Sequence, residues 1–138
     1  MADTIRLRVV TPIRLALDEE VDEVTAVGPL GEFTVLPNHI AFLTLLEIGE
    51  LSYKQGGERH FLALSGGYAE VLDNLVTVLA NNAEFGHEID VGRAQRAKDQ
   101  AEKTMAGLGL EDKTFKIAEA ALHRALLRLQ VASKEARR

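Results

Sequence analysis

The apolar residues of this chain change their spacing near residue 85, and this change divides the sequence into two parts. Up to about residue 80, apolar and polar residues alternate, as in Ile5-Arg6-Leu7-Arg8-Val9, which is the period of a strand with one buried face. From Asp90 onward, apolar residues recur at steps of three and four, which is the period of a helix. The sequence therefore predicts a β-domain followed by helices within 138 residues.

The first part contains a series of short strands separated by turn-forming residues. These are Gly28-Pro29, Pro37-Asn38, Gly49, Gly56-Gly57, Gly66-Gly67 and Asp73-Asn74. Strands at this spacing are typical of a sandwich or a barrel, and they bury their apolar faces by folding back as two sheets. We expect an all-β sandwich over residues 1–86, in which Ser65-Gly66-Gly67 forms a tight turn between two strands.

Two apolar stripes predict two helices in the second part. The first contains Val91, Ala94, Ala101, Met105 and Leu108, interrupted by Lys98, and the second contains Phe115, Ala118, Leu122, Ala125, Leu129 and Ala132. Because Gly107-Leu108-Gly109 breaks the pattern, we expect an antiparallel two-helix hairpin over residues 87–138 and an α+β fold class. Much of the seam is alanine, so the buried area per residue is small and the hairpin can open.

The end of the chain carries the opposite charge to the rest. Residues 112–138 hold seven basic and three acidic side chains, a net charge of +4, whereas the whole chain has a net charge of −5. The basic residues are Lys113, Lys116, Arg124, Arg128, Lys134, Arg137 and Arg138. Such a segment either lies on its own acidic body or binds an acidic partner. The net negative charge of the whole chain and the scarcity of aromatic residues in the helices argue against a nucleic-acid partner.

The sequence shows no catalytic or metal-binding pattern. There is no cysteine, and His60, His87 and His123 have no carboxylate or histidine at ligand spacing, while His39 suits a surface or half-buried histidine. Ser65-Gly66-Gly67 matches neither a nucleophile elbow nor a phosphate-binding loop. The longest apolar stretch, residues 40–46, is far shorter than the ~20 residues that span a bilayer, and the N-terminus has no secretory signal pattern. From the residues alone we therefore expect a soluble, cytoplasmic protein.

Five short motifs resemble the epsilon subunit of bacterial and chloroplast F-type ATP synthases. They are Val9-Val10-Thr11-Pro12, Gly31-Glu32-Phe33-Thr34-Val35-Leu36-Pro37-Asn38-His39, Leu64-Ser65-Gly66-Gly67-Tyr68-Ala69-Glu70-Val71, Val76-Thr77-Val78-Leu79-Ala80 and Ile89-Asp90-Val91-Gly92-Arg93-Ala94. They occur in the order and spacing of the family. The resemblance implies a central-stalk subunit with no chemistry of its own. Its β-domain would bind the gamma subunit and the c-ring, and its hairpin would restrain ATP hydrolysis in the catalytic head of alpha and beta subunits.

The resemblance also implies three groups of functional residues. Glu32 and His39 lie on a loop that faces the c-ring and stalk, and Lys116, Arg124 and Arg128 contact an acidic loop of the beta subunits. An ATP site found in some bacterial members corresponds to Glu84, Ile89, Asp90, Arg93, Ala94, Arg124 and Arg128. Those members carry a further arginine after Phe-Lys in the second helix. This chain has Ile117 there, so its phosphate-binding cluster is one charge short.

Taken alone, the residues leave structural alternatives open. Asp90 suits a helix N-cap, Arg124 and Arg128 suit a solvated helix face, and Glu32 and His39 suit a turn-rich segment. No cofactor is required, and ATP is a candidate regulatory ligand. The family implies peripheral attachment, through a proton-translocating complex, at the cytoplasmic face of the bacterial inner membrane. Two other functions stay open: a stand-alone nucleotide sensor, and an adaptor whose hairpin pairs with a coiled coil.

Overall fold

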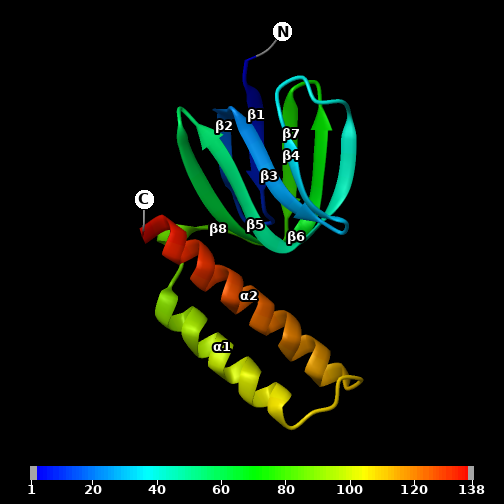
Figure 1. Cartoon of the computed structure of the whole chain (residues 1–138), viewed down its shortest axis with the longest axis vertical. Coiled ribbons are helices and arrows are strands. Elements are labelled where there is room, and N and C mark those ends of the chain that lie inside the picture. Colours follow the sequence, from blue (N-terminus) through cyan, green and yellow to red (C-terminus); the bar gives the residue numbers. More distant parts are fainter. Residues whose placement is uncertain (1–2, 137–138) are drawn as a thin grey trace. The chain divides into compact units, whose positions relative to one another are not determined.

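The computed structural model describes residues 3–136 and divides into two compact units, Met1–Phe85 and Gly86–Arg138 (Figure 1). The first unit contains strands β1 Ile5–Val10, β2 Leu15–Val21, β3 Glu23–Gly28, β4 Gly31–Val35, β5 Phe42–Gln55, β6 Glu58–Leu72, β7 Leu75–Ala80 and β8 Ala83–Phe85. The second contains the short 3-10 helix η1 Gly86–Glu88 and the helices α1 Val91–Ala106 and α2 Lys113–Ala136. The predicted α+β class, a β-sandwich followed by two helices, is confirmed. Arg137 and Arg138 of the basic segment lie outside the described residues.

Two long strands join the layers of the sandwich. The strand order is β2-β1-β7-β6-β5-β3-β4, with β8 paired to β6. Strands β5 and β6 pair with each other along nearly their whole length. One end of β6, residues 67–72, pairs with β7, whereas residues 62–64 pair with β8. Because the β5–β6 hairpin takes part in both layers, the chain closes around a core without a separate connection between two sheets (Figure 1).

The Ser65-Gly66-Gly67 segment lies within β6, so the predicted tight turn at this position is wrong. Gly66 has a φ of 102° and Gly67 a φ of 144°, which are conformations that favour glycine. A Cβ on Gly67 would collide with the backbone oxygen of Leu79 on β7. The two glycines therefore allow β6 to bend from one layer into the other while it stays paired. The glycines mark a bend within one strand here, and the sequence pattern alone does not distinguish such a bend from a turn between two strands.

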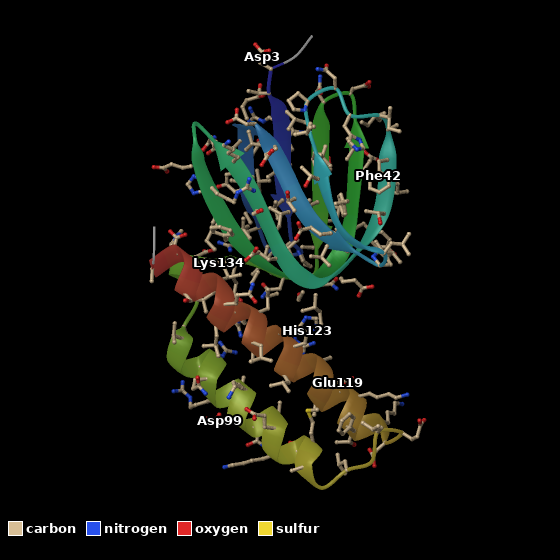
Figure 2. The ribbon with its side chains drawn as sticks, in the orientation of Figure 1. Asp3, Phe42, Asp99, Glu119, His123 and Lys134 are labelled. Carbon is tan, nitrogen blue, oxygen red and sulfur yellow. The ribbon has the colours of Figure 1, made fainter. Side chains whose placement is uncertain are left out.

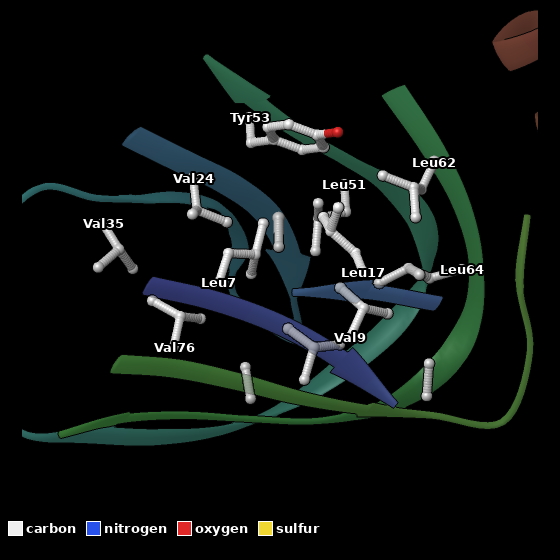
Figure 3. Close-up of a cluster of buried hydrophobic side chains, with 14 of the residues drawn as sticks. Leu7, Val9, Leu17, Val24, Val35, Leu51, Tyr53, Leu62, Leu64 and Val76 are labelled. Atoms are coloured by element: carbon white, nitrogen blue, oxygen red, sulfur yellow. The ribbon is translucent and has the colours of Figure 1, made fainter. Parts of the chain in front are cut away.

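The core of the sandwich is formed by the inward-facing side chains of alternating positions. In β1, Ile5, Leu7 and Val9 are fully buried, whereas Arg6 and Arg8 lie on the other face. Figure 3 shows how side chains from both layers meet, including Leu7, Val9, Leu17, Val24, Val35, Leu51, Tyr53, Leu62, Leu64 and Val76. The period-two pattern in the sequence thus identified the buried face of this strand correctly.

The second unit is an antiparallel pair of helices (Figure 1). Its seam includes four buried alanines, Ala94 and Ala101 from α1 and Ala118 and Ala125 from α2. Val91, which the sequence placed on the seam, is exposed. Lys98, which interrupts the stripe, is half-buried, and its Nζ lies 2.8 Å from Glu102 Oε1. The hydrogen bond to Glu102 raises the pKa of Lys98 and keeps the ammonium charged at the edge of the seam.

Candidate docking surface and nucleotide site

An apolar row crosses the outer face of the sandwich. Strand register places Leu45 opposite Tyr68, Tyr68 opposite Leu79, Leu79 opposite Val10, and Val10 opposite Leu15. Leu15, Leu45, Tyr68 and Leu79 are each between 52% and 57% exposed. Five neighbouring strands, β2-β1-β7-β6-β5, thus present one continuous row of apolar side chains to solvent. We call these five residues the apolar row.

Two shallow hollows lie beside the apolar row. One, with a volume of ≈ 330 Å³, is lined by Val10, Thr11, Pro12, Gly67, Tyr68, Leu79, Ala80 and Asn81. The other, with a volume of ≈ 290 Å³, is lined by Ala41, Phe42, Leu43, Glu70, Val71 and Leu72. Leu43 and Leu72 are exposed as well, so the apolar surface extends along β5 and β6. A contiguous apolar patch of this kind on the outside of a folded domain indicates a protein-binding surface.

The sequence contained a signal for this row that the strand predictions did not use. In Val76-Thr77-Val78-Leu79-Ala80, Leu79 has the same parity as Thr77 and therefore points outward. Tyr68 shares the outward parity of Glu70, and Val10 shares that of Arg8. Strands β1, β6 and β7 thus each carry an apolar residue on the same outward face as a polar one. Recognising the row also requires the register between strands, which the sequence pattern does not give.

His39 belongs to an aromatic cluster at one end of the sandwich. Its ring lies 6.0 Å from that of Phe42, which makes an edge-to-face contact with Phe33 at 5.5 Å (Phe42 is labelled in Figure 2). The ring nitrogen Nδ1 lies 2.7 Å from the backbone oxygen of Ile40. These contacts fix the ring of His39 next to the start of β5, where the exposed Leu43 follows.

Glu32 lies at the other end of β4 from His39. It is exposed and stands opposite Val27, next to the β3–β4 turn, in which Leu30 is fully exposed. His39 follows the far end of the same strand. The structure therefore does not bring these two predicted interface residues together. If both contact the rotor, they contact different parts of it.

The predicted nucleotide residues are divided between the two units. Glu84 lies on β8 in the first unit, and its carboxylate accepts a hydrogen bond from Asn82 Nδ2 at 3.4 Å. The other six residues lie in the second unit. Among them, Ile89 and Ala94 are buried.

Asp90 is the N-cap of α1. Its Oδ1 accepts a hydrogen bond from the backbone N–H of Arg93 at 3.0 Å. The side chain of Arg93 is exposed one turn into the helix. Capping accounts for an aspartate at this position whether or not a ligand binds nearby.

The basic residues of α2 that the sequence singled out share one helix but differ in exposure. Lys116 and Arg124 are exposed, whereas Arg128 is half-buried. Arg128 is four positions after Arg124, so the two lie on one face of the helix. Ile117, which stands where an arginine would complete the phosphate cluster, is exposed. Figure 2 labels Glu119, His123 and Lys134 along the same helix.

Two negative findings apply to the described part of the chain. Within residues 3–136, no three His, Asp or Glu side chains are grouped so that they could hold a metal ion. Neither of the helices described there is long and apolar enough to cross a membrane.

Two family models together match almost the entire chain. Residues 4–86 match the ATP synthase Delta/Epsilon chain beta-sandwich domain, and residues 87–133 match the long alpha-helix domain of the same chain. Full-length similarity extends to the ATP synthase epsilon chain of Geobacter metallireducens, at 54% identity over 138 residues and 100% of both chains. The epsilon chain of Nitratidesulfovibrio vulgaris is 50% identical over 131 residues, covering 95% of this chain and 97% of the relative.

Solved structures show the same fold. A chain in the Euglena gracilis mitochondrial ATP synthase (OSCP/F1/c-ring) superimposes with a TM-score of 0.79 at 25% identity, covering 100% of this chain and 84% of that one. A chain in the Tetrahymena thermophila mitochondrial enzyme superimposes with a TM-score of 0.63 at 17% identity, covering 92% and 95%. With both domains matched and full-length relatives above 50% identity, the chain belongs to the epsilon-chain family of F-type ATP synthases.

Proposed function

We propose that this chain is a non-catalytic subunit of the central stalk, in which the sandwich binds the gamma subunit and the c-ring and the hairpin restrains ATP hydrolysis. Membership of the epsilon family supports the first part, as does the likeness to a chain in a solved OSCP/F1/c-ring assembly. In a bacterial cell such a subunit is peripheral, attached through the proton-translocating complex to the cytoplasmic face of the inner membrane.

The apolar row carries the proposal for gamma. A subunit that turns with the rotor needs a rigid and extensive contact, and a row on five hydrogen-bonded strands offers one. Covering the exposed part of each leucine or tyrosine side chain is worth on the order of 1 kcal/mol. Leu79 stands at the centre of the row, flanked by Val10 and Tyr68, where the contact energy of an interface concentrates.

We assign the c-ring contact to the β3–β4 turn. Leu30 and Glu32 project there from a tight connection in which Gly28 pairs with Gly31. His39 and Phe42 lie near the opposite end of β4, where the exposed Leu43 follows, and we assign them to gamma.

The hairpin carries the proposed inhibitory contact with the catalytic head. Its alanine seam buries little area per residue, so α2 can leave α1 without a large loss of stability. Lys116 and Arg124 are exposed on α2 and, with Arg128, form the basic side that an acidic loop of the beta subunits would bind. Attraction of this kind weakens as salt concentration rises.

ATP is the proposed regulatory ligand of the closed hairpin. Arg93, Arg124 and Arg128 would hold its phosphates, since guanidinium groups match phosphate oxygens. The exposed Ile117 in place of a further arginine implies weak binding, in the millimolar range of cellular nucleotide. A ligand that binds only the closed form stabilises that form. Calorimetry with millimolar ATP tests this part directly, and an absence of binding heat would remove ATP from the proposal.

The central experiment measures binding of the full chain to the gamma subunit. Tyr68→Glu and Leu79→Glu place a charge within the apolar row and should each weaken binding at least tenfold. Leu110→Glu places the same charge on an exposed residue of the link between the helices and serves as the matched control. Equal affinity of the parent and all three variants for gamma would contradict the assignment of the row to gamma.

The inhibitory role is tested in the assembled enzyme. Cutting the chain after Glu88 removes α1 and α2 and leaves the sandwich. We expect faster ATP hydrolysis by the complex and an undiminished amount of bound sandwich. Unchanged hydrolysis with normal assembly would show that the hairpin is not a brake in this enzyme.

A further inference from the structure

The first residue of the second unit, Gly86, lies against the last two turns of α2. A Cβ placed on Gly86 would be 2.5 Å from the Cβ of Glu135 and 2.9 Å from the backbone oxygen of Val131. Side-chain Cβ atoms essentially never come that close to other heavy atoms. Gly86 is buried and Val131 has no exposed surface. The contact therefore exists only because residue 86 has no side chain.

Space, rather than backbone conformation, requires glycine at this position. Gly86 is not among the residues with positive φ, so alanine could adopt the same backbone. The backbone oxygen of Val131 is part of α2 and cannot move without the helix. A side chain at residue 86 would consequently push the end of α2 away from the segment that enters the hairpin.

This contact lies at the end of α2 that is opposite the link between the helices. The two helices are joined by residues 107–112, at the opposite end of the antiparallel pair. Along their length they meet through a seam containing the small side chains of Ala94, Ala101, Ala118 and Ala125. At the ends away from this link no short connection joins the two helices, so packing contacts such as that of Val131 and Glu135 with Gly86 keep them together.

We propose that the contact between Gly86 and the end of α2, residues 131–135, holds the hairpin closed, and we call this contact the latch. It forms because residue 86 has no side chain, so α2 can lie against the start of the hairpin unit. The latch rests on the geometry of this unit alone. It deepens the proposed function by naming the contact that must break first when α2 leaves α1. A larger residue at position 86 shifts the hairpin toward an open arrangement.

Pulsed electron paramagnetic resonance on the full chain tests the latch. The chain has no cysteine, so Arg96→Cys and Gln130→Cys, both at exposed positions, accept the only two spin labels. One position lies near the start of α1 and the other near the end of α2. We expect a single narrow distance in the parent, and a broader distribution extending to longer distances in Gly86→Ala.

Gly92→Ala is the matched control, since it also adds one methyl group near the start of the hairpin unit. A Cβ there would be 3.3 Å from Nη1 of Arg96 and 3.5 Å from Oδ1 of Asp90. In the cysteine pair Arg96 is replaced, so the closer of these neighbours is absent. The control should keep the narrow distance of the parent.

Amide hydrogen exchange of residues 131–135 gives a second measurement, which remains informative if α2 frays instead of swinging away. Exchange should be at least tenfold faster in Gly86→Ala than in Gly92→Ala. The double variant Gly86→Ala/Glu135→Gly lacks the atom nearest to the new Cβ. Its distance distribution should therefore differ less from that of Glu135→Gly alone than the distribution of Gly86→Ala differs from that of the parent. Parent-like distances and exchange in Gly86→Ala would overturn the latch, as would a complete absence of rescue.

The latch and the inhibitory role fail in different ways. If Gly86→Ala opens the isolated chain but the assembled enzyme hydrolyses ATP at the parent rate, the latch stands and the brake does not. If hydrolysis changes while the distances and exchange rates in the isolated chain do not, the latch is wrong.

Discussion

Asn38 and Asn74 bind each other through two hydrogen bonds between segments 36 residues apart in sequence. The backbone N–H of Asn38 donates to Asn74 Oδ1 at 2.6 Å, and Asn74 Nδ2 donates to Asn38 Oδ1 at 3.3 Å. Both residues have positive φ, 69° and 61°. The pair attaches the loop that carries His39 to the β6–β7 turn, and so fixes one end of the proposed gamma-binding surface.

Replacing Asn74 should loosen that loop. Asn74→Gly accepts the positive φ but lacks the amide, so it removes both hydrogen bonds without adding backbone strain. We expect a loss of about 1 kcal/mol in the free energy of unfolding and faster exchange of the Asn38 amide. Asn74→Asp keeps an acceptor for that amide and should lose less. Equal exchange rates in the parent and Asn74→Gly would show that the loop does not depend on this pair.

The fold class could be predicted because the positions that the apolar spacing places on one face are the positions that the structure buries. In β1, Ile5, Leu7 and Val9 alternate with polar residues and are buried, and Ala94, Ala101, Ala118 and Ala125 lie on the helical seam as the steps of three and four predict. Gly49 and Gly66-Gly67 look like turns in the sequence, yet they lie within the long strands β5 and β6. A Cβ on Gly49 would be 2.9 Å from that of Val27, which is a tertiary contact that local sequence does not encode.

The candidate sites were less accessible to sequence reasoning. Asp90 was identified as a helix cap from its position before the helical period, and the structure confirms that cap. The apolar row depends on the register of five strands. Tyr68 and Leu79 can be recognised as part of one surface only when the pairing of β6 with β7 is known. The phosphate-binding roles of Arg93, Arg124 and Arg128 stay predictions, because they concern a ligand.

Asp90 can be tested as a cap and as a ligand-binding residue with one pair of variants. Asp90→Ala removes the acceptor for the Arg93 amide and should lower the stability of the hairpin by about 1 kcal/mol, measured by thermal loss of the helical circular dichroism signal. Asp90→Asn keeps an acceptor oxygen and should stay close to the parent in stability. If Asp90 acts only as a cap, the Asp90→Asn variant and the parent bind ATP with equal affinity.

Asp112 supplies the matched comparison at the start of α2, where its Oδ1 accepts from the Thr114 backbone N–H at 2.7 Å. Asp112→Ala should destabilise the hairpin by a similar amount without affecting α1. If Asp90→Ala and Asp112→Ala both keep the thermal stability of the parent, other interactions hold the helix ends and these caps are not needed.

Asp18 should make part of the sandwich stability dependent on pH. Its Oδ1 accepts from Arg6 Nε at 2.6 Å and from Arg8 Nε at 3.3 Å, and the hydrogen bond from Arg6 is the main reason that its pKa is lowered. A lowered folded-state pKa stabilises the fold above the ordinary aspartate pKa of about 3.9. That contribution disappears as pH falls through the lowered value.

Asp18→Asn should therefore be less stable than the parent near neutral pH, with the difference vanishing in strong acid. Urea unfolding at several pH values measures this difference. Glu19→Gln removes a charge from the neighbouring exposed residue and controls for net charge. A stability difference between Asp18→Asn and the parent that stays constant down to a pH of about 2, well below the ordinary aspartate pKa, would contradict the ionic origin of the effect.

The bend of β6 should depend on Gly67 because of space as well as backbone conformation. Gly67→Ala would drive a methyl group into the backbone of β7 at Leu79 and Ala80, a strand held between β1 and β6, so neither side can yield easily. We expect a loss of at least ~3 kcal/mol in unfolding free energy, or no cooperative unfolding transition at all. Gly57→Ala is the control, since its φ of 88° carries backbone strain but nothing lies within 4 Å of its Cβ position. That variant should lose only about 1 kcal/mol. The difference between the two variants measures the close approach of β6 to β7, and equal losses would mean that positive φ alone explains the glycine.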